Sequence, residues 1–131
     1  MKDRFRFRAW HKPTKKMFEV FCFTDKEVFE NTIDGVGARP TNPANIDDCV
    51  LIQCTGLKDK NAKLIYEGDI LRRKNSAGRV VEWDDDELTF LFTTLDGEAS
   101  MPLARYDIQK LELEIIGNIY ENHKLLEEEN A

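Results

Sequence analysis

Residues 55–70 read Thr55-Gly56-Leu57-Lys58-Asp59-Lys60-Asn61-Ala62-Lys63-Leu64-Ile65-Tyr66-Glu67-Gly68-Asp69-Ile70. Two glycines and a polar loop surround the short apolar run at 64–66. These turn-forming residues predict a sharp turn that leads into a strand. The stretch contains no usual catalytic signature. It is therefore informative about the fold and gives no indication of a reaction.

The size and composition fit one domain, or one small domain with a substantial extension. The chain has 131 residues, of which 41% are hydrophobic and 34% charged, enough for a core beneath a polar surface. No apolar run approaches the ~20 residues that span a bilayer. The basic start of the chain is not followed by an apolar signal core, so the sequence predicts a cytoplasmic protein without a membrane segment.

The cysteines and histidines give little support for a metal or nucleophilic site. Cys22, Cys49 and Cys54 form no CxxC pair, and His11 and His123 lie near opposite ends. A zinc site needs four closely placed ligands, so we expect reduced thiols in or near the core and no cofactor. Cys54 is conceivable as a nucleophile, but no spacing pairs it with either histidine.

Charge is unevenly spread along this acidic chain, whose net charge is −6. Residues 1–20 hold seven Lys/Arg against two acids, residues 82–98 hold seven acids and no base, and the last twenty residues hold six acids and one lysine. Such a protein is repelled by nucleic acid overall, although one basic face can still bind it. The asymmetry equally favours head-to-tail self-association.

Alternating residues predict an N-terminal hairpin. Residues 4–10 alternate strictly, with Phe5, Phe7 and Ala9 on one face of a strand, and residues 17–23 return as an aromatic-rich strand after a turn containing Pro13.

A helix and a loop are predicted next. Thr24-Asp25-Lys26-Glu27 is a capping-box pattern and predicts a short helix to Asn31. Residues 34–48 contain two glycines and two prolines and are predicted to be a loop, in which Gly35-Val36-Gly37 lacks the context of a phosphate loop. A short apolar strand at 49–53 leads into the opening run.

From Gly68 onward the pattern is all β. One helical turn is predicted at 104–107, and Gly117 is predicted to be a bulge or bend in the last strand. The predicted strands span residues 70–73, 79–83, 88–95, 99–103 and 111–120. Five short strands with tight turns, and a helical turn before the fifth, are typical of an SH3-like barrel. Pro102 suggests that the fourth strand lies at an edge. Residues 121–131 are predicted to be a short helix or tail that Asn122 caps.

Three blocks of the sequence resemble the YopX family of bacteriophage and prophage proteins. They are the Phe7-Arg8-Ala9-Trp10 strand with the Thr14-Lys15-Lys16-Met17 turn, the central Gln53–Ile70 stretch, and the closing Ile116-Gly117-Asn118-Ile119-Tyr120-Glu121-Asn122. The blocks span nearly the whole chain in the family's order. Four positions depart from the usual pattern: His11 for an aspartate, Cys54 for an aromatic, Ala62 for a glycine and His123 for a proline. Alanine disfavours the left-handed conformation that a glycine would adopt at 62.

The resemblance implies a largely β protein with an SH3-like barrel, encoded by a phage or prophage and acting in the bacterial cytoplasm, for which homo-oligomers are plausible. No enzymatic activity is established for the family, so no catalytic residue is carried over. The motif residues expected to have structural roles are Gly56, Leu57, Asp59, Tyr66, Gly68, Asp69, Gly117, Asn118 and Tyr120.

Two clusters of charged residues each allow two interpretations of their role. The acids Asp84-Asp85-Asp86-Glu87 lack the spacing and glycine of a calcium loop, so a solvated turn is favoured over a cation site. Basic residues near the N-terminus are suited either to phosphates and a stacked base or to an acidic protein surface. They are Arg4, Arg6, Arg8, Trp10, Lys12, Lys15 and Lys16. Asp69 is interpreted as a turn-capping residue rather than a catalytic acid.

The sequence thus predicts a mainly β protein in three parts: an N-terminal β-rich segment with a short helix (1–66), an SH3-like barrel (67–120) and a C-terminal helix or tail (121–131). The hypothesis it favours is a non-enzymatic protein–protein interaction or self-assembling module. The alternative is a nucleic-acid-binding accessory protein that uses the basic strand.

Overall fold

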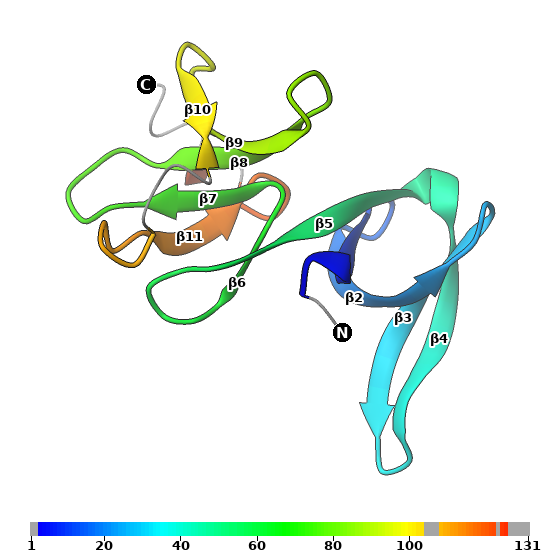
Figure 1. Cartoon of the computed structure of the whole chain (residues 1–131). Helices are drawn as coiled ribbons and strands as arrows, with labels where there is room; N and C mark the ends of the chain where they lie inside the picture. Colours follow the sequence, from blue (N-terminus) through cyan, green and yellow to red (C-terminus); the bar gives the residue numbers. More distant parts are fainter. Residues whose placement is uncertain (1–2, 104–107, 123, 126–131) are drawn as a thin grey trace. The chain divides into compact units, whose positions relative to one another are not determined.

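Figure 1 shows the computed structural model of the chain, in which residues 3–103, 108–122 and 124–125 are described. Strands account for 57% and helices for 8% of the structure, and the strands form two antiparallel sheets, so the predicted mainly β class is confirmed. The chain divides into a first unit, Met1–Gln53, and a second unit, Cys54–Ala131. Residues 54–66, which the sequence places in the N-terminal segment, belong here to the second unit.

The first unit is an antiparallel sheet with the spatial order β4-β3-β2-β1-β5. Its elements are η1 (Asp3–Phe5), β1 (Phe7–His11), β2 (Lys16–Phe23), β3 (Glu27–Asp34), β4 (Gly37–Asn45), η2 (Ile46–Asp48) and the first part of β5 (Cys49–Lys58). The predicted hairpin is confirmed, with Ala9 of β1 opposite Phe18 of β2. Its first strand begins later than predicted, because Arg6 N donates to Asp3 O and closes the 3-10 turn of η1.

The helix predicted at residues 24–31 is wrong, because these residues form a turn and the start of strand β3. Thr24 Oγ1 does accept hydrogen bonds from Lys26 N at 3.1 Å and from Glu27 N at 3.0 Å. These local bonds serve a helix N-cap and a tight turn equally well. Pairing of β3 with both β2 and β4 favours the strand over the helix, and it buries Val28 fully.

The loop predicted at residues 34–48 is also wrong over most of its length. Strand β4 pairs with β3 in register from Asp34 opposite Gly37 to Glu27 opposite Asn45, with one bulge. β4 lies at the edge of the sheet, where a proline breaks no ladder hydrogen bond on its open side. Gly35 and Val36 form the hairpin turn, in which Val36 N donates to Asp34 Oδ1.

The second unit contains a five-stranded antiparallel sheet with the order β10-β9-β8-β7-β11. Its elements are the last part of β5, β6 (Leu64–Tyr66), β7 (Asp69–Arg72), β8 (Arg79–Asp84), β9 (Thr89–Thr94), β10 (Ser100–Pro102) and β11 (Glu114–Asn118). Side chains from successive elements form one buried core: Ile65, Leu71, Val81, Phe92, Leu103, Ile108 and Leu113. In the described part of the chain this sheet does not close into a barrel.

Most strands of the second unit lie where the sequence predicts them. β10 is an edge strand, and β11 shifts register between Ile115 and Gly117, which confirms the predicted bulge. The helical turn predicted at 104–107 lies outside the described residues. So does most of the predicted C-terminal helix, of which residues 124–125 are described and helical. Asn122 Oδ1 accepts a hydrogen bond from Asn118 N at 3.0 Å, and Leu125 N donates to the Asn122 carbonyl.

A buried carboxylate holds the loop of the opening run. Asp59 is fully buried, and its Oδ1 accepts hydrogen bonds from Asn61 N at 2.8 Å and Lys63 N at 3.0 Å. Its Oδ2 accepts a third from Ile115 N at 3.1 Å. One side chain thus stabilises the β5–β6 loop and joins it to β11. Within this loop Ala62 adopts φ +63°, so the left-handed conformation persists without a glycine.

The turn from β6 into β7 has a second buried carboxylate. Asp69 Oδ2 accepts a hydrogen bond from Tyr66 N at 2.8 Å. Gly68 has φ +86°, and a Cβ atom there would lie 2.9 Å from Tyr120 Cε2. Ile119 N donates to the Gly68 carbonyl. Gly68 is therefore needed both for its conformation and for its lack of a side chain.

Candidate functional site

The basic residues singled out from the sequence do not form one stripe. Arg4 lies in η1, Lys12 and Lys15 lie in the β1–β2 turn, and Lys16 begins β2. Only Arg8 and Trp10 alternate onto one face of β1.

Acids of the first unit neutralise part of this charge. Arg8 Nε lies 3.0 Å from Glu19 Oε1, and Arg6 Nε lies 3.6 Å from Asp3 Oδ1. The guanidinium of Arg4 stacks on the Phe5 ring with its carbon 4.8 Å from the ring centroid. The basic surface is therefore smaller and more screened than the sequence alone indicates.

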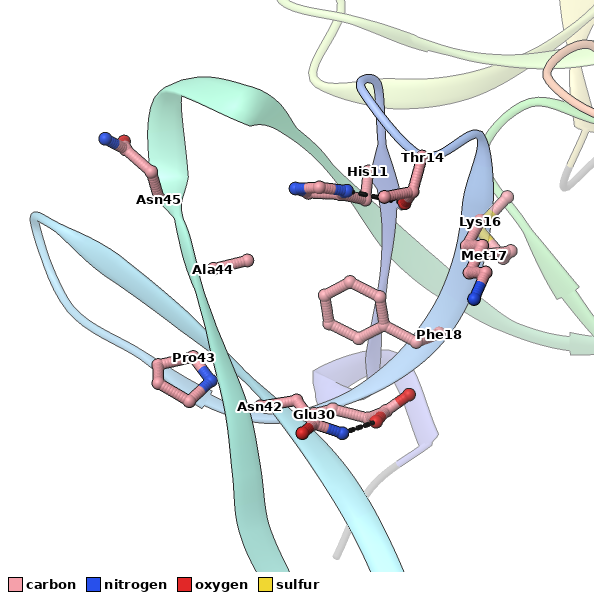
Figure 2. A pocket seen from close by; sticks show the side chains of 10 residues that line it. All are labelled: His11, Thr14, Lys16, Met17, Phe18, Glu30, Asn42, Pro43, Ala44 and Asn45. Carbon is pink, nitrogen blue, oxygen red and sulfur yellow. Dashed lines mark hydrogen bonds between the residues drawn. The ribbon is translucent and has the colours of Figure 1, made fainter.

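The first unit instead contains a groove of about 590 Å³ between the β1–β2 hairpin and β4. Figure 2 shows its ten lining residues, with Phe18 and Ala44 pointing into the space between the strands. Bulges in the β2–β3 and β3–β4 pairings bend the sheet. Asn42, with φ +46°, turns β4 further. The bent sheet places β4 opposite the start of β2.

The groove has an apolar floor and a polar rim. Met17, Phe18, Pro43 and Ala44 supply the apolar surface. Two hydrogen-bonded pairs lie on the rim and are drawn as dashed lines in Figure 2: His11 Nδ1 with Thr14 Oγ1 at 2.6 Å, and Asn42 Nδ2 donating to Glu30 Oε2 at 2.7 Å. Lys16 and Asn45 complete the rim. An apolar floor with a few orienting polar groups is the usual composition of a binding site.

This groove brings together residues that the sequence does not connect. Of the predicted basic residues it includes only Lys16, and it adds His11. Sequence reasoning missed the residues of β4 because that segment is rich in prolines and glycines. The hydroxyl of Thr32 on β3 hydrogen-bonds that of Thr41 on β4, but this pairing has no periodic signature in the sequence.

The three thiols differ in their surroundings. The three cysteines form no disulfide; Cys22 is exposed and Cys54 is buried. Burial, with the nearby Asp48 carboxylate, raises the pKa of the Cys49 thiol against the opposing charge of Lys12, which disfavours the nucleophilic thiolate. Cys54 Sγ accepts a hydrogen bond from Gly56 N, and His123 lies outside the described residues.

The acidic residues 84–87 lie at the end of β8 and in the turn that follows it. Asp84 Oδ1 accepts a hydrogen bond from Asp86 N at 3.1 Å, and Asp85 Oδ1 accepts one from Trp83 Nε1 at 2.8 Å. Among the residues that the structure describes, no group of three His, Cys, Asp or Glu side chains is placed to hold a metal ion. The same residues include no helix that is long and apolar enough to cross a membrane.

The motif residues of the second unit have structural contacts. Leu57 packs against the core, and Tyr66 is buried. Asn118 Oδ1 accepts hydrogen bonds from Tyr120 N at 3.0 Å and Glu121 N at 2.8 Å, so it ends β11 in a turn.

At Gly117 the backbone approaches Asn122 closely. A Cβ atom at Gly117 would lie 2.6 Å from Asn122 Oδ1. The hydrogen bond from Asn118 N to that oxygen explains the approach, because the amide side chain lies directly over the bulge. Gly56 also adopts a positive φ, at +82°, within the register shift of the β5–β6 pair.

A family model described as YopX protein matches residues 6–127. The chain belongs to the YopX family. Its fold is similar to that of protein EF1440 from Enterococcus faecalis, with a TM-score of 0.66, 26% identity and coverage of 92% of this chain and 96% of that one. It is also similar to the YopX-family protein yopX from Bacillus subtilis, with a TM-score of 0.55, 14% identity and coverage of 93% and 98%. No curated protein matches the chain. The function of this YopX-family domain is uncharacterised.

Proposed function

We propose that this chain is a non-enzymatic interaction protein that binds a segment of a partner protein in the groove of its first unit. The observation that carries the proposal is the groove itself, about 590 Å³ with Phe18 and Ala44 facing its interior. Its apolar floor accepts one or two side chains of a partner. Its rim offers Lys16, a His11–Thr14 pair and a Glu30–Asn42 pair to orient the partner's backbone.

The proposal includes self-association, which the uneven charge supports, and a phage or prophage origin with action in the bacterial cytoplasm, which the family resemblance suggests. It also includes an SH3-like arrangement of the second unit. Support for that arrangement is the strand order, in which the fifth strand, β11, pairs with the first, β7.

The proposed role of the groove is tested by filling it with a large side chain. Ala44→Trp places a large side chain opposite Phe18, whereas Val36→Trp adds the same side chain at a turn where Val36 is 94% exposed. We expect proteins captured from prophage-carrying cells by the natural sequence to be captured equally by the Val36→Trp variant and at least tenfold less by Ala44→Trp. Equal capture by both variants would show that the groove is not the binding site.

The nucleic-acid alternative has to use Arg8 and Trp10, since these lie on one strand face, and Arg8 already pairs with Glu19. A mobility-shift experiment at low salt tests it, with Arg8→Gln as the variant. A salt-dependent shift that this variant weakens would favour nucleic acid over a protein partner. We expect no shift.

A further inference from the structure

Strand β8 of the second unit has turns of opposite charge at its two ends. Arg72 ends β7, the turn before β8 carries Arg73 and Lys74, and Arg79 begins the strand; no acid occurs between them. The turn after it carries Asp84, Asp85, Asp86 and Glu87. The six residues of β8 separate the two turns by about 20 Å at ~3.3 Å per residue. The turns therefore cannot neutralise each other within one copy.

The basic turn borders a small cleft with an apolar floor. This basic cleft has a volume of about 200 Å³, and its floor consists of Phe92, Leu111 and Leu113, with Arg73 and Arg79 also lining it. The guanidinium carbon of Arg79 lies 5.4 Å from the centroid of the Phe92 ring. Phe92 and Leu113 belong to the core, so the cleft gives access to core side chains from the surface.

The described acids of the second unit make no ion pair with the basic residues of this cleft. No ion pair among the described residues involves Arg73, Lys74 or Arg79. Glu114, opposite Arg72, lies 3.4 Å from Lys60 Nζ, and Asp96 lines an adjoining cavity together with Arg79 but makes no ion pair with it. The cleft therefore suits an apolar side chain flanked by carboxylates.

The acidic turn, defined as residues 84–88 at the end of β8 and in the turn that follows it, has this composition. Leu88 at its end is 73% exposed and directly follows the four acids. Single exposed leucines are ordinary; what distinguishes Leu88 is that the basic cleft of the same fold matches its size and the charge of its neighbours. Asp86 and Glu87 make no ion pair among the described residues and are available to a partner.

We propose that the acidic turn of one copy docks in the basic cleft of a second copy, with Leu88 on the apolar floor and Asp86 and Glu87 paired with Arg73 and Arg79. The inference rests on the self-association included in the proposed function. Because the two surfaces differ, the contact is head-to-tail, and each pair of copies keeps one turn and one cleft free to extend a chain or close a ring. A turn in a small cleft buries little area, so the association is weak and sensitive to salt.

A nucleic acid fits the cleft less well than a second copy. A strand leaving the cleft along β8 would reach the acidic turn within a few nucleotides, and Asp96 lines the adjoining cavity. The chain's net charge of −6 adds to the repulsion.

The test uses light scattering at low salt with two variants that each remove one half of the contact. Arg73→Gln with Arg79→Gln disables the cleft, and Glu87→Gln with Leu88→Ala disables the turn without touching a buried side chain. Each variant alone is expected to scatter as the 15.2 kDa monomer, with self-association weakened at least tenfold relative to the natural chain. Mixed, the two variants are expected to form a one-to-one dimer that does not grow, since the mixture has one intact turn and one intact cleft per pair.

The control is Lys26→Gln with Lys63→Gln, two exposed lysines outside the groove and the basic cleft, which removes the same two positive charges as the cleft variant and is expected to leave self-association unchanged. Equal melting temperatures of all variants show that loss of association is not loss of folding. If the natural chain associates and both variants still do, the inference is wrong and the proposed self-association stands. A natural chain that is monomeric at every concentration and salt level overturns both. Binding of an oligonucleotide that the cleft variant abolishes would assign the cleft to nucleic acid instead.

Discussion

The two units of this chain use β-structure differently. In the first unit, the described hydrophobic side chains that are fully buried are only Ala9, Val28 and Ile52, while Phe5, Phe21 and Phe23 are each more than two-fifths exposed. The second unit has a core of seven buried side chains from β6 to Leu113 and two buried carboxylates. The first unit therefore depends on backbone ladders and leaves apolar side chains exposed, whereas the second depends on packing and on buried hydrogen bonds.

This contrast can be measured because each unit contains one tryptophan, Trp10 in the first and Trp83 in the second. Replacing either by phenylalanine leaves a fluorescence signal from a single unit. Urea unfolding of the two single-tryptophan forms then reports the stability of each unit separately.

The largest effect is expected from Asp59→Ala. It leaves three backbone N–H groups, those of Asn61, Lys63 and Ile115, without their acceptor, at a cost of roughly 3–5 kcal/mol. The second unit, followed by Trp83 fluorescence, should lose far more stability than the first unit, followed by Trp10 fluorescence. Asp59→Asn, which keeps one acceptor oxygen, should restore part of the loss. A cost below about 1 kcal/mol would mean that the loop does not depend on this carboxylate.

A smaller loss is expected from Gly68→Val. The substitution puts a β-branched side chain at φ +86° and 2.9 Å from Tyr120 Cε2, which costs about 2–4 kcal/mol through backbone strain and overpacking. Gly35→Val is the matched control, because a Cβ atom there meets nothing within 4 Å. Equal denaturant midpoints for the two variants would show that the Gly68 turn is not a constraint.

The sequence predicts the second unit better than the first, and the reason is physical. In the second unit the turn residues and the apolar runs agree, so strands β7 to β11 are predicted within a few residues. In the first unit they conflict: Thr24 caps a turn as well as it would cap a helix, and Pro40 and Pro43 resemble loop residues although an edge strand accepts them.

The candidate site is predicted even less well from sequence. The groove depends on two bulges and on the bend at Asn42, none of which has a distinct sequence signature. The basic residues are visible in sequence, but their partners Glu19 and Asp3 are assigned only by the fold. Tertiary pairing therefore decides which of the charged and apolar side chains are available for binding.

A gain of stability is expected from Ala62→Gly. Ala62 is held at φ +63° in the second unit, and relief of that strain outweighs the extra backbone entropy of glycine by about 0.5–1 kcal/mol. Ala38→Gly on strand β4, where φ is not positive, should instead destabilise the first unit slightly. Denaturant midpoints from Trp83 and Trp10 measure the two changes. A loss of stability at both positions would mean that the strain at Ala62 is already relieved.

The smallest effect concerns Glu67 and depends on pH. Burial raises the pKa of the Glu67 carboxyl, and the charges of Asp85 and Glu82 raise it further. A raised pKa means that the folded state prefers the protonated acid, so the stability Glu67 contributes is present below its ordinary value of 4.5 and is lost as pH rises through the folded pKa. Glu67→Gln should therefore stabilise the second unit at pH 7, by less than about 1 kcal/mol because solvent screens a half-exposed group. The gain should vanish near pH 4, and Glu98→Gln, at an exposed position of the β9–β10 turn, is the matched control. If the stability gain of Glu67→Gln stays constant from pH 4 to pH 7, then packing, and not charge, accounts for the difference between glutamate and glutamine at this position.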